Sequence, residues 1–220
     1  DKAPKGNDLR GQQAKDWQKL LIEQGYTCRT IPKEFGGYGA EPDIIKTRII
    51  AEEFSKARIN TGLGGQGISM LVPTLLEMGT QEQKEHFIRP TIMGDMIWCQ
   101  GYSEPDAGSD LANVKTRAEL VDGRWIVNGQ KVWTSLAQFA DWVFVVARTA
   151  PGSERHAGLS YLLVPMNQPG VEIRPIVQIT GGTEFNETFF SNAVTDEDLV
   201  VGGVGNGWKV AMGTLAFERG

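Results

Sequence analysis

Two segments of the sequence carry residues whose types and spacing could bind a flat ligand that also bears negative charge. In residues 100–110, the Ala-Gly-Ser step that ends at Ser109 would let backbone N–H groups and a hydroxyl approach an anion closely. In residues 128–135, the chain delivers Trp133 followed by two hydroxyl side chains. An indole beside small donors could hold a planar, hydrogen-bonding ring system. Taken singly, the first segment also fits an ordinary loop, and the second also fits a strand end with a tryptophan packed in the core.

The elements around these segments should place both of them at strand ends. Pro105 keeps Glu104 out of the helical region and removes a donor, so the strand expected at 97–103 should end there. An Asp-Gly turn precedes the strand expected at 124–132. Glu104 and Asp106 flank the proline and should point in different directions. We therefore expect a structural role for Glu104 rather than general acid–base catalysis by the two carboxylates as a pair.

The first 95 or so residues show helical periodicity. We expect helices at residues 8–24, 43–56 and 68–78, and the pair Thr80 and Gln83 forms a capping box that begins a fourth. The apolar stripes of these helices are Trp17, Leu20 and Leu21; Ile45, Ile49, Ile50, Phe54 and Ala57; Leu71, Leu75 and Met78; and Phe87, Ile88 and Ile92.

From residue 96 to residue 195 the period becomes that of strands. The expected strands are 97–103, 114–121, 124–132, 142–147, 159–165, 171–179 and 188–194, separated by turns that contain Gly, Pro or Asn. A helical layer followed by a β layer predicts an α+β fold. We expect an N-terminal all-α domain at 1–95, a middle β-barrel or sandwich domain at 96–201, and the start of a C-terminal helical bundle at 202–220.

After a glycine-rich joint, residues 208–220 are expected to be helical. Trp208, Ala211, Met212 and Leu215 predict a buried stripe, which Glu218 continues. The sequence then ends without a cap or a glycine-rich exit, so we expect the natural chain to continue.

Residues 62–67 satisfy the Gly-x-Gly-x-x-Gly pattern of dinucleotide-binding proteins. That fingerprint requires a preceding strand and a βαβ unit, whereas a helix is expected here. We therefore reject a nucleotide site at this position.

Composition excludes several classes of function. A net charge of −5 without a basic run argues against nucleic acid as the main partner, and no apolar stretch approaches the roughly 20 residues of a membrane span. Cys28 and Cys99 make no disulfide framework, which favours a reduced, cytoplasmic setting. With only His86 and His156, both expected at the surface, a metal site is not expected.

Together, Glu104-Pro105-Asp106-Ala107-Gly108-Ser109-Asp110 and Asn128-Gly129-Gln130-Lys131-Val132-Trp133-Thr134-Ser135 resemble the two-part signature of the acyl-CoA dehydrogenases, in order and correctly spaced. The resemblance covers nearly all of the chain and implies a helical domain, a β domain and a largely missing second helical domain, with FAD held between them. It implies α,β-dehydrogenation of an acyl-CoA thioester to the trans-2-enoyl-CoA in lipid metabolism and β-oxidation. It also implies an electron-transfer flavoprotein as partner and a homo- or heterotetramer, or a dimer.

The resemblance further assigns site residues. The FAD contacts it implies are Gln100, Tyr102, Ser103, Ser109, Trp133, Thr134 and Ser135. The first three would line the flavin edge, and Ser109 would meet the ligand phosphate region or the acyl-CoA. Trp133 would pack against the isoalloxazine, with Thr134 and Ser135 forming hydrogen bonds around it. Ser135 stands where the family more often has Thr, and we expect its bond toward flavin N5 to be kept.

The catalytic base is expected at Glu218. A minority of the family place the base in a Leu-x-x-Glu-Arg sequence, which Leu215 to Arg219 match; most place it later, in the part that is missing here. Burial on an apolar stripe would raise the pKa of a carboxylate, as suits a base that faces a carbon acid. A buried glutamate paired with an arginine is the competing interpretation.

Three further readings stay open. Flavin monooxygenases and nitroalkane oxidases share the fold, and a non-catalytic subunit could complete a partner's site.

Residues 181–187 depart from the Arg-containing pattern of straight-chain enzymes and resemble a bacterial subgroup that acts on bulkier acyl-CoAs, some of its members as heterotetramers. This segment could shape the acyl pocket or be a plain turn.

Overall fold

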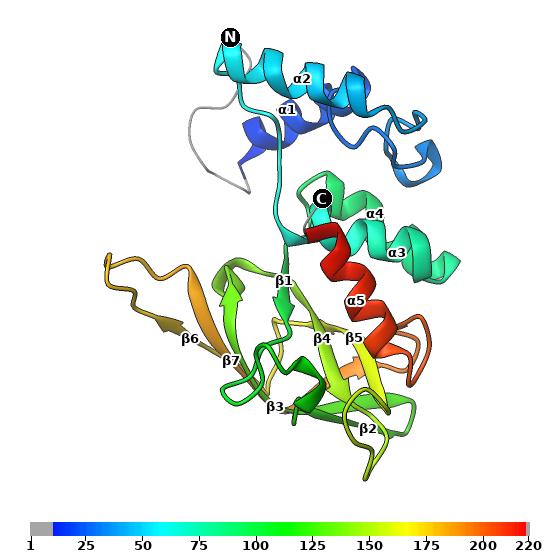
Figure 1. The fold of residues 1–220 in the computed structure, drawn as a ribbon, viewed down its shortest axis with the longest axis vertical. Helices are drawn as coiled ribbons and strands as arrows, with labels where there is room; N and C mark the ends of the chain where they lie inside the picture. The colour runs from blue at the N-terminus through cyan, green and yellow to red at the C-terminus, as the bar shows by residue number, and fades with distance from the viewer. Residues whose placement is uncertain (1–10, 219–220) are drawn as a thin grey trace.

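The computed structural model describes residues 11–218, as helices stacked on one strongly curved sheet (Figure 1). The helices are α1 (Gln12–Glu23), α2 (Ile44–Ala57), α3 (Val72–Met78), α4 (Gln81–Ile92) and α5 (Gly207–Glu218). The strands are β1 (Trp98–Gly101), β2 (Arg117–Val121), β3 (Arg124–Ser135), β4 (Trp142–Arg148), β5 (Leu159–Pro165), β6 (Val171–Ile176), β7 (Phe185–Asp196) and β8 (Val200–Val201). The predicted α+β fold is confirmed.

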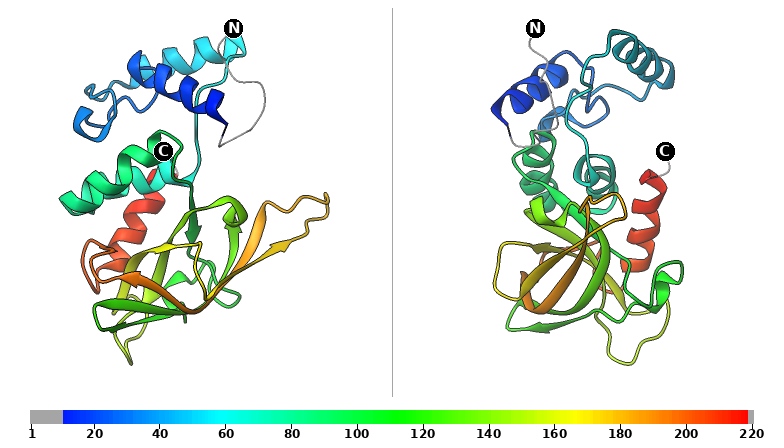
Figure 2. Two further views of the ribbon diagram at one scale, coloured as in Figure 1. Left: turned by 180° about the vertical axis from the view of Figure 1, so that it is seen from behind. Right: turned by 90° about the vertical axis from the view of Figure 1, so that its left-hand side faces the viewer.

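The sheet is mixed, with the order β6-β7-β3-β2-β4-β5-β8 and with β1 paired to β4. The β1–β4 pair is parallel and all the long ladders are antiparallel. The ribbon of β6 and β7 extends beyond the rest of the sheet, as the left view of Figure 2 shows. In the middle of the sheet β2 and β4 meet through a single pair, Arg117↔Arg148, and β6 forms one edge.

Strands β4 and β5 are buried on both faces, which explains their nearly continuous apolar sequences. On β4, Val143 and Val145 pack into a core cluster inside the curve of the sheet. The alternate residues Phe144 and Val146 pack into a second cluster, which includes side chains of α3, α4 and α5. The helices α3, α4 and α5 and one face of β4 consequently share this second cluster.

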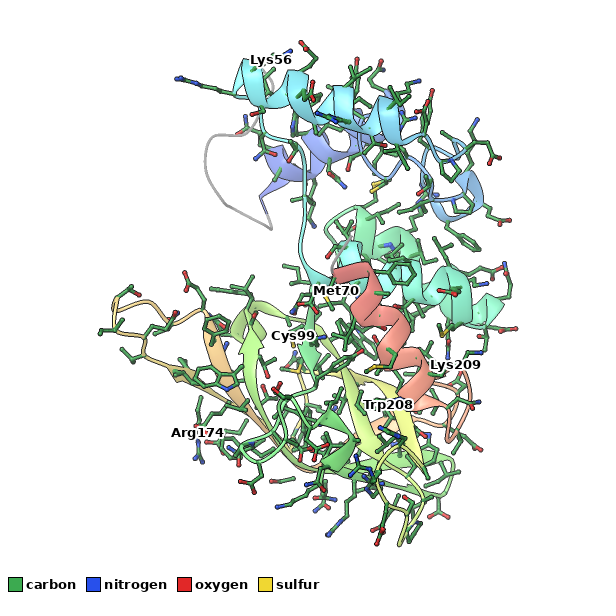
Figure 3. All side chains as sticks on the ribbon, viewed as in Figure 1. Lys56, Met70, Cys99, Arg174, Trp208 and Lys209 are labelled. Atoms are coloured by element: carbon green, nitrogen blue, oxygen red, sulfur yellow. The ribbon has the colours of Figure 1, made fainter. Side chains whose placement is uncertain are left out.

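The helices differ in how much they bury. In α4 the Thr80–Gln83 capping box and the inward Phe87, Ile88 and Ile92 are confirmed. In contrast, α2 has no buried residue, and Ile45 on its apolar stripe is exposed. Its polar face carries exposed charges such as Lys56 (Figure 3).

Two helices differ locally from the expectation. In α1 the buried face is Ala14, Gln18, Leu21 and Ile22, because the Gln18 amide enters the core and donates to the Ile92 carbonyl at 2.8 Å. The expected inner residues Trp17 and Leu20 are only half-buried. The third helix opens with a π-helical turn, Gly67–Leu71, before it becomes α-helical. Residues 8–10 of the expected first helix lie outside the described residues.

Strand boundaries shift by a few residues. The strand expected at 171–179 ends at Ile176, since Val177 and Ile179 are exposed in the ribbon's turn. Strands β3 and β7 are each longer than expected, and they pair from Arg124↔Asp196 to Ser135↔Phe185 across two bulges. The two-residue β8 had no sequence signal. Both histidines are exposed, as expected.

A buried ion pair connects the two motif segments. The Lys131 ammonium has no exposed surface and donates to Glu104 Oε1 at 2.8 Å, and also to the backbone carbonyls of Tyr102 and Val146. Glu104 accepts two further hydrogen bonds from the backbone N–H groups of residues 115 and 116. The structural role expected for Glu104 is thus observed in the contacts of its carboxylate.

Electrostatics favour the charged form of Glu104. Burial alone would raise the pKa of this carboxyl, but the Lys131 ammonium and the hydrogen bonds from residues 115 and 116 bring the pKa below its ordinary value. Burial lowers the pKa of Lys131 to about 8, although the Glu104 carboxylate opposes that shift.

Replacing Glu104 by Gln should lower the free energy of unfolding by about 3–5 kcal/mol, because the buried Lys131 charge would lose its counter-ion. The matched control is Asp106→Asn, which removes the exposed pair with Lys115 and should change stability by less than about 1 kcal/mol. Urea unfolding at neutral pH measures both. Equal losses of unfolding free energy in the two variants would show that the buried pair contributes no more to stability than the exposed one.

The Glu104 contribution should also depend on pH. Its folded-state pKa lies below the 4.5 of an unperturbed glutamate, so the stability it supplies is complete above pH 4.5 and is lost as the pH falls through the folded-state value. The gap in urea midpoint between wild type and Glu104→Gln should therefore narrow from about pH 7 to about pH 3. A constant gap would contradict the shift.

Candidate functional site

The end of β3 presents an exposed tryptophan on a strained backbone. Trp133 has a φ of +60°, in the left-handed region that is unfavourable for a bulky residue. It lies in a bulge, where the pairing of β3 with β7 shifts between Lys131 and Thr134. As a result the indole leaves the sheet with 59% of its surface exposed, an arrangement suited to stacking on a flat ligand.

The two hydroxyl residues after Trp133 lie in different environments. Thr134 is fully buried, and its hydroxyl has no hydrogen-bond partner within the described residues. Ser135 is half-buried and lines a cavity. Ser135 is therefore placed to meet a ligand directly, whereas Thr134 points into the protein.

Strand β1 and the residue that follows it supply further polar groups. The amide nitrogen of Gln100, in β1, is buried without a partner among the described residues, and the buried hydroxyl of Tyr102, just after β1, has only long contacts with Thr214, Tyr161 and Gln100. The backbone N–H of Gln100 donates to Gln66 Oε1 at 3.0 Å, and the carbonyl of Ser103 accepts from Val132 on β3 at 2.9 Å. That last bond joins the two motif segments directly ahead of Trp133.

Ser109 lies apart from these residues in an exposed position. Glu104 and Ala107 exchange two backbone hydrogen bonds and close a tight turn that projects the following loop. The predicted cofactor residues thus form an inner group at the ends of β1 and β3, with Ser109 on an outer loop.

A cavity of about 220 Å³ opens between the helices and the end of β3. One wall is the glycine-rich run of residues 63–68, and the opposite wall includes Trp98, Ser135 and Leu136. Because no strand leads into that run, the rejection of a dinucleotide fingerprint is confirmed. The run instead forms the wall of a mainly apolar cavity beside Ser135.

Helix α5 buries only part of the stripe predicted for it: Ala211 is buried, and Trp208 and Leu215 pack half-buried against the core. Its buried residues are Gly207, Val210, Ala211 and Thr214, because the helix turns this face toward β5 and α3. Met212 and Glu218 are exposed, and Trp208, at the start of α5 in Figure 3, is half-buried against His156. The expectation that burial would desolvate Glu218 is therefore wrong for the described residues, while Arg219 and Gly220 lie outside them.

Glu218 nevertheless lies within electrostatic reach of the site. Burial raises the pKa of Tyr102 beyond its ordinary range, and the Glu218 carboxylate adds to that rise. The part of α5 that carries Glu218 therefore lies near the predicted flavin-edge residue Tyr102.

The residues present fit an extended ring system with polar edges, as in a flavin. Trp133 offers an exposed aromatic face, and the Gln100 amide nitrogen, which has no partner within the described residues, offers a hydrogen bond. Sequence analysis did not assign roles to Gln66, Asn186 or Lys131. Only Lys131 carried a signal, because it belongs to the motif from Asn128 to Ser135.

Other site types find no support in the described part of the chain. No group of His, Cys, Asp and Glu side chains there is arranged to hold a metal ion. Within residues 11–218, no helix combines the length and apolarity needed to cross a membrane.

Comparison with known proteins identifies relatives of both parts of the chain. Residues 3–95 match a model of the acyl-CoA dehydrogenase N-terminal domain, and residues 99–193 match one of the acyl-CoA dehydrogenase middle domain. The chain is 53% identical over 214 residues to the acyl-CoA dehydrogenase IpdE1 of Mycolicibacterium smegmatis. The aligned region covers 93% of this chain and 54% of that protein.

Solved structures give the same picture. The Tcur3481-Tcur3483 steroid ACAD superposes with a TM-score of 0.79 at 31% identity, over 96% of this chain and 54% of that one. The ChsE4-ChsE5 complex of Mycobacterium tuberculosis gives a TM-score of 0.77 at 33% identity, over 94% and 52%. The chain spans about half the length of the curated relatives it matches.

The glycines of the cavity wall should respond differently to substitution. A Cβ on Gly67 would lie 2.7 Å from the Trp98 ring and 2.9 Å from Thr91, whereas one on Gly64 would meet nothing within 4 Å. Gly67→Ala should destabilise the protein by about 1–3 kcal/mol through overpacking, and Gly64→Ala, its control, by less than about 0.5 kcal/mol. Urea unfolding tests this, and equal losses would contradict the packing described.

Proposed function

Because the chain belongs to the acyl-CoA dehydrogenase family, we propose that the intact protein is an FAD-dependent acyl-CoA dehydrogenase. It would convert an acyl-CoA thioester into the trans-2-enoyl-CoA and pass the electrons to an electron-transfer flavoprotein. The observation that carries this proposal is the exposed Trp133 indole at the end of β3, two residues before Ser135, which lines an apolar cavity.

The residues at the ends of β1 and β3 would hold the cofactor. Trp133 would stack on the ring system, Ser135 would donate at its edge, and the Gln100 amide nitrogen, which has no partner within the described residues, would donate to one of its polar atoms. Bound FAD supplies the acceptor for the hydride that leaves the β carbon. Ser109, on the outer loop, would contact the phosphate-bearing part of the ligand or the acyl-CoA.

Glu218 would take the α proton of the thioester. The exposed Glu218 carboxylate on α5, within electrostatic reach of Tyr102, can meet a substrate that lies over the ring system. The substrate itself would then remove water from around the carboxylate and raise its basicity. The cavity beside Ser135 would receive the apolar end of the acyl group.

The relatives suggest an assembled enzyme. One structural neighbour is described as the ChsE4-ChsE5 complex and another as the Tcur3481-Tcur3483 steroid ACAD. By analogy, the working form would be a dimer or tetramer, either of one chain or with a second chain of the same family, in the cytoplasm. A bulky, ring-bearing acyl group is the corresponding substrate class.

Anaerobic bleaching of the protein-bound flavin by acyl-CoAs tests the reaction class. We expect at least one member of a panel from butyryl-CoA to branched and ring-bearing thioesters to bleach the flavin. A flavin that stays oxidised with every member would favour the monooxygenase, nitroalkane oxidase or non-catalytic subunit readings.

Replacing Glu218 by Gln should lower kcat/KM by about 10²- to 10⁴-fold, because the α proton would lose its acceptor, while flavin retention stays unchanged. Glu77→Gln removes an exposed carboxylate near the end of the neighbouring α3 and serves as the control with unaltered turnover. Full activity of the Glu218 variant would move the base to another residue.

A further inference from the structure

Strand β7 supplies the neighbours of Trp133 from across the sheet. Phe185 pairs with Ser135, and Asn186 pairs with Thr134. Both belong to residues 181–187, the segment whose sequence left a pocket role and a plain turn as alternatives. The structure places its last residues directly opposite the bulge.

Phe185 contacts the Trp133 indole edge-on. The two ring centroids are 6.1 Å apart and the rings are inclined at 82°, the T-shaped geometry that aromatic pairs favour. Among the described residues, this is the one ring contact of Trp133. Because most of the indole is exposed, few other atoms can fix its orientation.

Asn186 holds the backbone on the other side of the bulge. It is fully buried, and its amide nitrogen donates to the Thr134 carbonyl at 3.0 Å and to Gln138 Oε1 at 2.6 Å. The backbone N–H of Leu136 adds a bond to the Glu184 carbonyl at 2.7 Å. Strand β3 is thus fixed to β7 immediately after Trp133, so the remaining freedom of that residue lies in its side chain.

We propose that Phe185 is a positioning residue, which holds the Trp133 indole in the plane needed to stack on the bound ring system. This inference rests on the proposed function, because it takes that ring system to be the flavin. Phe185 acts through Trp133 and touches neither flavin nor substrate. The ring would otherwise rotate about its two side-chain torsions, and part of the binding free energy would be spent on ordering it.

The test compares Phe185→Leu with wild type in the intact, flavin-loaded protein. We expect an altered visible circular dichroism of the bound flavin and about a 2- to 10-fold weaker flavin affinity, the range that corresponds to one aromatic pair. Phe185→Tyr keeps the ring and should show the wild-type circular dichroism and flavin affinity. Phe185→Met, which keeps the volume without the ring, provides a second variant if leucine disturbs folding.

Phe189→Leu is the matched control. Phe189 lies on the same face of β7 as Phe185 and is similarly half-buried, but its ring packs under the Arg174 guanidinium at 4.3 Å. Figure 3 shows Arg174 on the side of the sheet away from α5. This variant should leave the flavin spectrum and affinity unchanged.

A double-mutant cycle decides whether Phe185 acts through Trp133. In a Trp133→Leu background, adding Phe185→Leu should produce no further change in flavin affinity or circular dichroism. An equal effect in both backgrounds, or no effect of Phe185→Leu in the wild type, overturns the inference while the flavin site stands. A wild-type protein that retains no flavin overturns the proposed function itself.

Discussion

The buried Lys131–Glu104 pair is the interaction on which the site depends. Lys131 lies two residues before Trp133, and Glu104 directly follows Ser103, so one ion pair sets the spacing of both predicted cofactor segments. The ammonium satisfies three acceptors, and the carboxylate accepts two backbone N–H groups besides. Removing either partner would leave a charge in the interior, whereas the complete network leaves neither charge unpaired.

A shared core makes this site rigid with respect to the helices. The cluster on the helical side joins Phe87 of α4, Tyr102 after β1, Tyr161 of β5 and Val210 of α5. Tyr161 stacks on Phe144 with an interplanar angle of 4°, and its hydroxyl accepts from Thr214 on α5. Tyr102, a predicted flavin-edge residue, and the helix that carries Glu218 are therefore parts of one packed unit. Only α2 stands outside it, with no buried side chain.

Local signals in the sequence predicted most of the elements. The capping box at Thr80, the Asp-Gly turn before β3 and the alternating apolar residues each reflect a short-range cause, and each appears in the structure. The two motif segments, which the sequence grouped together, are also joined in the structure through Lys131 and Glu104. Periodicity was only partly right for α5: Ala211 is buried as predicted, but Met212 is exposed and Val210 and Thr214 are buried as well, because the packing partners decide which face turns inward.

Other features of the site depend on distant residues and had no local signature. The bulge that exposes Trp133 arises from the pairing of β3 with a strand about 50 residues later, and the role of Asn186 exists only once that pairing has formed. Gln66 likewise meets Gln100 across 34 residues of chain. A sequence shows which side chains are available, but the register in which the strands pair decides which of them meet.

The left-handed backbone of Trp133 can be explained in the same terms. A bulky residue in this conformation costs on the order of 1–3 kcal/mol, and such strain persists only where the surroundings determine it. Here the strand is held before the bulge by Lys131 and after it by Asn186. A regular strand would pack the indole back against the sheet. The strain therefore keeps an aromatic face open to solvent before any ligand arrives, and the cost of exposing it is met during folding rather than during binding.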